Sequence, residues 1–494
     1  MTRLMTSFHI RKIIGGIRLK INATPRRNLF LIPPFLFLII QSLLLTIGLR
    51  FLYWREGPWQ FIPSSELHAD TLLNVFFFHG QPPLFNALLY IFDNFGTFAP
   101  IAWHILFISG TCLQIWMISQ LIWYWTRDKS LSLLGASTYA LLPGTHLYSM
   151  WLFYTQPVAI LLTITVWSLV SGYEKGKIRY FLLSNIGILI LFLWRSSIVW
   201  PIALLWLFAI SVIVTKRRHQ ASRKALAIFF VVTLFSTSTI GIFTVKNQVI
   251  FGVQTQSSWV YENFAKVIFY SVSKDELTIA SRGNLCFEEL IKVGTFQDIK
   301  DYPTCVSESS SDKLSLPHVE ALDKAVWTNG NLNYNYKGRL LLGEQWKKFT
   351  AKIIELNPKI IFRVLWPSFS DHRRGSITQF LWPSTDYKFI ASNSEKLGYF
   401  GKAWMFTFAW IPLASLLLII YSILIATVRK TRRPRFFTSY IISLSLVTVL
   451  SLTYIFLEIG ENQRYRAELD PLLISLAVVG FHQALNIFRI KVAK

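Results

Sequence analysis

The sequence predicts a polytopic α-helical membrane protein with about ten transmembrane helices and one soluble α or α/β region on the extracytoplasmic side. Three observations predict this fold class. Of the 494 residues, 53% are hydrophobic and 15% are charged, whereas an average soluble domain has roughly 25% charged residues. Several apolar runs reach the ~20 residues with which a helix crosses a bilayer. Lys and Arg, which give the chain a net charge of +24, are concentrated between those runs.

Six basic clusters predict the orientation of the chain. Residues 1–28 carry Arg and Lys without an acid, and the other clusters lie at 127–129, 175–179, 216–224, 429–435 and 489–494. Cytoplasmic loops of membrane proteins carry an excess of Lys and Arg, so we expect all six clusters, and both termini, in the cytoplasm. The rest of the chain is nearly neutral. The charge is therefore a topology signal, and no nucleic acid is expected as a partner.

The expected spans are the apolar runs between these clusters. The first run is long and lacks a small-residue cleavage site, so we expect it to be retained as a span. The run at 180–214 is divided at Arg195, because basic clusters flank both of its ends and the chain must then cross twice. The spans are expected at 29–53, 98–125, 131–147, 158–171, twice within 180–214, and at 225–245, 403–428, 436–457 and 472–488.

Three segments organise the chain on this topology. Residues 1–245 form an N-terminal transmembrane module whose first outer loop is 54–97, residues 246–402 form the soluble region, and residues 403–494 form the C-terminal transmembrane helices. Cys286 and Cys305 fall in the soluble region. An oxidising compartment would permit a disulfide between them, but their spacing does not decide between a bridge and two free thiols.

The first outer loop carries the candidate general base. Glu66 and Asp70 stand four residues apart, so on a helix they share a face and raise the pKa of at least one carboxyl. We expect Asp70 to be the base that deprotonates an acceptor hydroxyl, with Glu66 as the second candidate. The alternative is an interfacial helix whose acids face water. His79 is a candidate substrate-binding residue; no metal site is expected, although Mg²⁺ or Mn²⁺ could serve a leaving phosphate.

Three arginines are candidates for binding a phosphate. Arg195 interrupts the apolar run in LFLWRSSIVWP, and Arg464 and Arg466 lie in GENQRYRAELDP, an expected outer turn before the last span. A guanidinium pairs with phosphate through two parallel hydrogen bonds. The alternatives are that Arg195 extends to the outer interface and that the charges of the turn pair with one another.

Aromatic residues beside amides are candidates for contact with a sugar. Tyr154 lies in the outer turn YSMWLFYTQP, and Trp259 and Tyr334 lie in segments rich in Asn and Tyr. Aromatic faces suit sugar rings and lipid chains; the alternative is an ordinary aromatic core. The sequence has no phosphate-binding Walker loop, no dinucleotide glycine fingerprint, no paired CxxC and no HExxH, so cytosolic nucleotide chemistry has no support.

Several short segments resemble the GT-C superfamily of membrane glycosyltransferases, in particular bacterial membrane proteins similar to dolichyl-phosphate-mannose–protein mannosyltransferases. Asp70 in the first outer loop, followed by Gln81-Pro82-Pro83-Leu84, is similar to the acid and the Pro-Pro-Leu helix entry of that group. The other similar segments are WLFYTQPVAILL, LWRSSIVW, KNQVIFG, SSWVYENFAK and GENQRYRAELDPLL. The resemblance implies a GT-C-like fold, a polyprenyl-phosphate sugar donor, and a place in the bacterial inner (plasma) membrane.

The expected function is therefore transfer of a sugar from a polyprenyl phosphate to an extracytoplasmic glycan, lipid or protein. A transporter or flippase for a lipid-linked or anionic substrate is the first alternative, and it would distribute polar residues through the spans. A non-catalytic membrane protein of envelope assembly is the second alternative. It would leave Asp70, Arg195 and Arg464 apart in space, whereas an enzyme needs them around one cavity.

Overall fold

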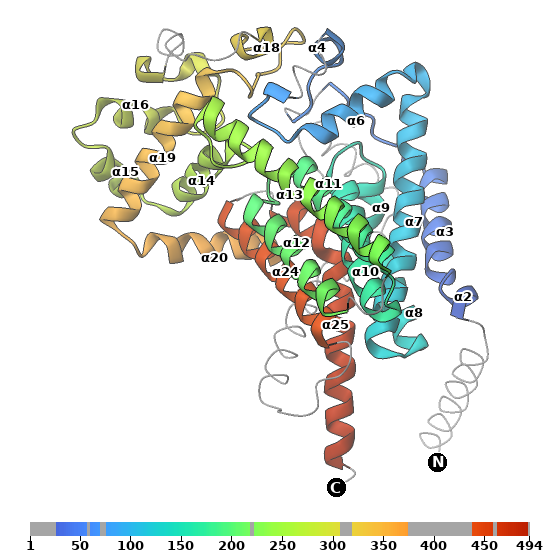
Figure 1. Cartoon of the computed structure of the whole chain (residues 1–494). Helices are drawn as coiled ribbons and strands as arrows, with labels where there is room; N and C mark the ends of the chain where they lie inside the picture. The colour runs from blue at the N-terminus through green and yellow to red at the C-terminus, as the bar shows by residue number, and fades with distance from the viewer. Residues whose placement is uncertain are drawn as a thin grey trace, which may run out of the picture.

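A computed structural model describes residues 26–56, 60–69, 76–217, 222–306, 319–373, 437–457 and 462–492. Every regular element in these ranges is a helix (Figure 1), and two isolated β-bridges, Leu52 with Trp151 and Val326 with Leu332, are the extended pairings found among them. The described part of the soluble region is therefore α and not α/β. The expected span at 403–428 and the candidate base Asp70 lie outside the described residues.

Four described helices are long and apolar enough to cross a membrane. They are α7 (Ala99–Thr126), α10 (Thr155–Lys175), α13 (Arg223–Phe251) and α24 (Phe437–Leu457). Shorter apolar helices accompany them: α3 (Ile32–Thr46), α11 (Ile178–Trp194) and α12 (Trp200–Lys216). The prediction of a membrane-embedded helical protein is supported by these helices, while the number of ten spans stays a prediction.

The bundle is organised around α10. This helix packs against α7, α11 and α25 (Asn462–Val492). In an apolar stretch of 18 residues within α10, 78% of the residues are buried. In the corresponding 18-residue stretch of α13, 17% of the residues are buried, and Val231, Leu234 and Phe235 are largely exposed. A helix that is apolar on its exposed side suits contact with lipid. We therefore assign α10 to the interior of the bundle and α13 to its periphery.

Two expected elements differ in the structure. The span expected at 131–147 is two helices, α8 (Lys129–Leu141) and α9 (Pro143–Ser149). The break falls at Leu142, which is extended because a residue before proline avoids the helical region; α8 is about 20 Å long, too short to span alone. The expected outer turn at 458–470 is helical from Asn462 onward, as the first turns of α25.

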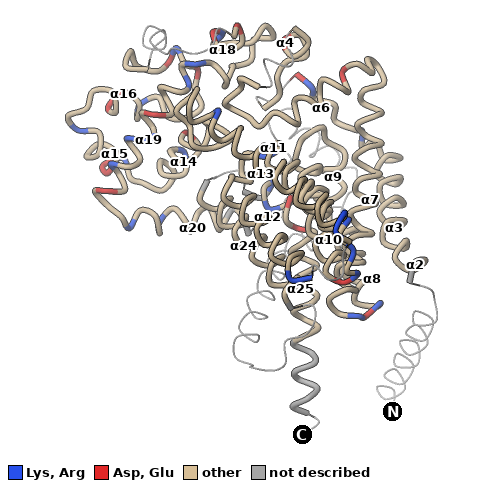
Figure 2. Tube along the Cα trace, viewed as in Figure 1, with Lys and Arg blue, Asp and Glu red and all other residues tan. Residues whose placement is uncertain are grey.

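The basic loops of the bundle lie at one end, as the charge pattern predicted for them. Arg127 pairs with Glu174, Lys175 Nζ donates to the hydroxyl of Tyr180 at 2.8 Å, and the Arg217 guanidinium lies 3.9 Å from the ring centroid of Tyr173. These contacts join three loops that are far apart in sequence. Figure 2 shows blue segments of the bundle gathered toward the end where α8 lies.

The soluble region lies beside the other end of the bundle (Figure 1). Its helices are α14 (Trp259–Ser271), α15 (Lys274–Ser281), α16 (Leu285–Val293), α18 (Glu320–Asp323), α19 (Gly338–Leu356) and α20 (Ile360–Arg373). All of these except α18 enclose a separate apolar core that includes Phe287, Trp346 and Phe349, whereas Ala321 and Leu322 of α18 belong to the core of the bundle. The preceding helix α13 continues to Phe251, six residues past the expected boundary at 245.

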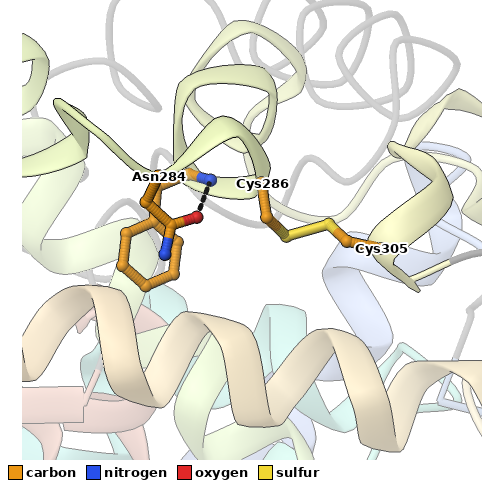
Figure 3. The surroundings of a disulfide bond; sticks show 4 residues. Asn284, Cys286 and Cys305 are labelled. Carbon is orange, nitrogen blue, oxygen red and sulfur yellow. Dashed lines mark hydrogen bonds between the residues drawn. A yellow bond between two sulfur atoms is a disulfide. The ribbon is translucent and has the colours of Figure 1, made fainter.

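A disulfide joins Cys286 in α16 to Cys305 in the short helix η4 (Thr304–Val306). Figure 3 shows this bridge beside the start of α16, where the side-chain oxygen of Asn284 accepts a hydrogen bond from the backbone N–H of Phe287 at 3.1 Å. Asn at this position satisfies a backbone donor that the first turn of a helix leaves free. The question that the cysteine spacing left open is thus answered by a bridge.

Candidate functional site

A cavity of about 260 Å³ lies where the first outer loop, the bundle and the soluble region meet. Each of the three parts supplies one wall. The loop and α6 (Pro83–Asp93) contribute Gln60, Gly80, Gln81, Pro82, Phe85 and Asn86; the bundle contributes Tyr154, Trp194, Arg195, Ser196 and Tyr465; the soluble region contributes Trp259, Asn263, Lys266, Thr295, Phe296 and Gln297.

The loop wall is shaped by the Pro-Pro pair at the start of α6. Pro82 is extended and Pro83 occupies the first turn of the helix, where its missing N–H costs no hydrogen bond. Asn86 then joins two parts of the loop, since its side-chain oxygen accepts from the N–H of Ile62 at 3.0 Å and its nitrogen donates to Gln81 Oε1 at 3.1 Å. The sequence interpretation of Pro-Pro as a helix entry fits this geometry.

His79 lies behind the cavity and does not line it. Its Nδ1 lies 2.7 Å from the hydroxyl of Ser258, and its carbonyl accepts from the N–H of Ser258 at 2.8 Å. The ring is completely buried, and this burial lowers the pKa of His79 to about 3. The structure therefore gives His79 a role in joining the outer loop to the soluble region, and not the predicted contact with substrate.

Gly80 completes the same joint. Its N–H donates to Asn335 Oδ1 at 2.8 Å, and its carbonyl accepts from the hydroxyl of Ser257 at 2.6 Å. A Cβ atom at this position would lie 2.7 Å from Trp259 Nε1 and 2.9 Å from Asn335 Oδ1. Glycine is thus required here for a close approach between the loop backbone and the soluble region.

Arg195 is buried at the break between α11 and α12, and it lines the cavity. Its guanidinium lies between the rings of Tyr154 and Tyr465, at 4.2 and 4.3 Å from their centroids, and 2.9 Å from Glu468 Oε1. Glu468 also accepts from the hydroxyl of Tyr454 at 2.8 Å. Burial contradicts the alternative in which Arg195 extends to the interface. Its Nε is buried and donates to none of the described residues, so this donor lacks the partner that buried polar groups usually have.

The other two predicted arginines lie outside the lining of the cavity. Arg464 donates to the hydroxyl of Tyr154 at 3.0 Å and lies 5.0 Å from the ring centroid of Tyr465, so it supports the residues that hold Arg195. Arg466 pairs with Asp470 at 3.0 Å, one turn along α25. Such pairs at a spacing of four contribute to the stability of a helix, and the pair occupies both charges within α25. A direct phosphate contact is supported for Arg195 alone among the three.

Of the two candidate bases, Glu66 is among the described residues. Asp70 lies outside the described residues. Glu66 is buried in α4 (Ser64–Ala69), and its Oε1 lies 3.6 Å from Lys324 Nζ of the soluble region. Glu66 therefore ties the loop to the soluble region and does not line the cavity. No acid is found among the described residues of the lining, and no three His, Cys, Asp or Glu residues of the described ranges form a metal-binding group.

The aromatic candidates lie at the cavity or directly behind it. Trp259 and Tyr154, two of the candidate substrate-binding residues, line the cavity. Tyr334 is buried behind Trp259, with ring centroids 5.0 Å apart, and its hydroxyl donates to the carbonyl of Phe296 at 3.3 Å. Tyr334 thus supports the wall without lining it.

Sequence reasoning missed five residues of the soluble wall: Asn263, Lys266, Thr295, Phe296 and Gln297. The signal for the first two was available, because residues 259, 263 and 266 follow a spacing of four and three and share one face of a helix. Residues 295–297 lie in an irregular turn after α16, and no periodic pattern marks such a segment.

Comparison of the chain with known protein families, with curated proteins and with solved structures gives no match.

Proposed function

We propose that the chain is a membrane glycosyltransferase that moves a sugar from a polyprenyl phosphate to an extracytoplasmic acceptor. The cavity is the observation that carries this proposal. It combines the aromatic faces of Tyr154, Trp194 and Trp259, the amides of Gln81 and Asn263, and a buried cation. Ligand sites are concave and mostly apolar, with a few polar groups that fix orientation. A sugar with a phosphate needs this mixture of surfaces.

The phosphate would be held by Arg195. In the reaction, the bond between the anomeric carbon and the phosphate oxygen breaks, and the phosphate leaves with the electron pair. A fixed guanidinium stabilises the charge that develops on that oxygen. Tyr154, Tyr465 and Glu468 hold Arg195 in place, so little reorganisation is required when the charge appears.

The acceptor hydroxyl would be activated by Asp70. The carboxylate takes the hydroxyl proton as the oxygen forms its bond to the anomeric carbon. This assignment rests on the chemistry that the reaction requires and on the resemblance of the first outer loop. The position of Glu66 supports Asp70 over Glu66, because Glu66 contacts Lys324 and does not line the cavity.

The arrangement of charge supports an extracytoplasmic cavity. The basic loops lie at one end of the bundle, and the cavity lies at the junction of the bundle with the disulfide-bonded soluble region. Disulfides persist in oxidising compartments, and basic loops remain in the cytoplasm. Both observations agree with a protein of the bacterial inner membrane whose soluble region faces outward.

Turnover of lipid-linked sugars tests the proposal. The protein, reconstituted in lipid nanodiscs, is incubated with polyprenyl-phosphate hexoses and pentoses and with an extract of envelope glycans, lipids and proteins as acceptors, and mass spectrometry measures loss of the sugar from the donor lipid. We expect consumption of at least one donor by the native protein. Asp70→Asn should abolish it, while Glu66→Gln, the matched change four residues earlier, should retain activity within a few-fold. Consumption of no donor, or full activity of Asp70→Asn, would refute the proposal.

Mass spectrometry of envelope glycans and lipid-linked sugars from a deletion strain identifies the substrates. Loss of one sugar from a glycan, with accumulation of its lipid-linked form, is the expected result. Loss of the same sugar, with its lipid-linked form retained on the cytoplasmic leaflet, would favour the flippase alternative instead.

A further inference from the structure

The turn at 294–298 forms part of the soluble wall and has an unusual backbone. Phe296 has φ 60°, in the left-handed region. Bulky side chains rarely adopt this conformation, and residues held in it gather at functional sites, where the surrounding structure over-determines them.

A buried ion pair holds the turn. Glu262 Oε1 accepts the N–H of Phe296 at 2.5 Å and lies 3.5 Å from Arg339 Nη1. Arg339 in turn donates from Nη2 to the carbonyl of Gln297 at 2.5 Å. Both charged side chains are buried, and a buried pair with further hydrogen bonds fixes one geometry of its neighbours.

Two tyrosines beside this ion pair also hold the turn: the hydroxyl of Tyr302 lies 3.4 Å from Glu262 Oε1, and the Arg339 guanidinium lies 4.5 Å from the ring centroid of Tyr334. Tyr302 donates its hydroxyl proton to the carbonyl of Gly294 at 2.9 Å, and its oxygen accepts the N–H of Gln297 at 3.2 Å. Tyr334 donates to the carbonyl of Phe296 at 3.3 Å. The backbone of the turn is therefore bonded to buried side chains at each of residues 294, 296 and 297, and its conformation is fixed before a ligand binds.

The turn presents its side chains to the cavity opposite one face of α14. Residues 295–297 line the cavity together with Trp259, Asn263 and Lys266. The ring centroids of Trp259 and Phe296 are 6.4 Å apart with their planes close to perpendicular. This wall belongs to the soluble region, whereas Arg195 belongs to the bundle, from which a lipid-linked donor arrives.

We infer that the turn and the facing side of α14 form the subsite for a saccharide acceptor. The rings of Phe296 and Trp259 would contact the C–H face of a sugar, and the amides of Asn263 and Gln297 would bind its hydroxyls. Glu262 and Arg339 are positioning residues that act through the turn. The inference rests on the proposed function and narrows its acceptor to a glycan or glycolipid.

Binding of methyl glycosides tests the subsite without turnover. Saturation-transfer NMR is recorded on the full chain in nanodiscs with the methyl glycosides of common hexoses as probes. We expect binding of at least one probe by the native protein. Phe296→Gly should weaken it tenfold or more, because glycine keeps the left-handed turn but lacks the ring. Phe296→Tyr should retain binding, and so should Tyr270→Ala, which removes an exposed ring elsewhere on α14.

Two results would overturn the subsite: no methyl glycoside binds the native protein, or Phe296→Gly binds a methyl glycoside as strongly as the native protein does.

Glu262→Gln tests the positioning role. It should weaken binding of the same probe while the variant keeps its purified yield and its native size-exclusion profile. Unchanged binding by that variant would overturn the positioning role. If binding depends on Phe296 while no polyprenyl-phosphate sugar is consumed, the subsite stands and the transferase proposal fails. If the native protein and Phe296→Gly consume a donor equally and no glycoside binds, the transferase proposal stands and the subsite fails.

Discussion

Lowering the pH should open the joint between the first outer loop and the soluble region through His79. Burial lowers the pKa of this imidazole from 6.5 to about 3 in the folded protein. The unfolded chain therefore binds a proton more readily than the native chain between these values. Stability is fully present above pH 6.5 and is lost as the pH falls toward 3. Each pH unit in this window costs about 1.4 kcal/mol, so about 2 kcal/mol is lost near pH 5.

Hydrogen exchange with mass spectrometry measures this loss locally. The N–H of Ser258 donates to the carbonyl of His79, so peptides that contain Ser258 report opening of the joint. After correction for the intrinsic pH dependence of exchange, the opening constant should rise roughly 30-fold between about pH 7.5 and about pH 5.

His79→Asn is the control, because its amide can occupy the position of Nδ1 beside the hydroxyl of Ser258 and does not titrate. The variant should lose the pH dependence at these peptides and keep the pH dependence that other histidines cause elsewhere. An equal pH dependence in the native protein and in His79→Asn would refute the assignment of this effect to His79.

Three further changes test the fold around the site. Gly80→Ala should destabilise the joint by about 1–3 kcal/mol, because the new Cβ would lie 2.7 Å from an indole nitrogen; hydrogen exchange in the same peptides measures it. Cys286→Ser with Cys305→Ser should lower the stability of the soluble region by about 3 kcal/mol, since the bridge closes a loop with a sequence separation of 19, seen as a lower midpoint in denaturant. Glu468→Gln should cost about 3–5 kcal/mol in thermal unfolding, because it leaves the buried Arg195 without its counter-charge.

Matched controls separate these effects from general damage. Gly241→Ala, where a Cβ meets nothing within 4 Å, should leave the joint unchanged. Glu174→Gln removes the partner of the exposed Arg127 and should cost less than about 1 kcal/mol. A cost for Glu174→Gln as large as that for Glu468→Gln would contradict the distinction between the exposed and the buried pair.

The helices could be predicted where a long apolar run decides the structure. The expected spans at 98–125 and 225–245 correspond to α7 and α13, because about 20 apolar residues in sequence leave few alternatives to a spanning helix. The expected span at 131–147 was wrong as a single helix, since Pro143 removes a backbone donor and forces Leu142 out of the helical region. Composition alone did not outweigh that local constraint.

The site could be predicted in part, and the errors have one physical cause. Arg195 was found because a cation inside an apolar run is costly unless it has a function or a partner. His79, Arg466 and Glu66 carry the same chemistry as site residues, but the structure engages them in contacts with Ser258, Asp470 and Lys324. Ser258 and Lys324 are distant in sequence from His79 and Glu66, whereas Asp470 lies one turn from Arg466, in the segment whose charges the alternative interpretation expected to pair with one another. Residue type therefore indicated chemistry, while tertiary contact decided which residues remain at the cavity.

The three walls of the cavity come from the beginning, the middle and the end of the chain. Gln81 belongs to the first outer loop, whereas Tyr465 lies in the first turns of α25. A ribosome releases these residues in order, so the early loop leaves the insertion machinery long before the helix that closes its pocket has been synthesised. Truncated chains that stop before α25 would lack Tyr465 from the lining and Glu468 as the partner of Arg195, and ligand binding in a pulse-labelled sample should begin only after synthesis of the final helix.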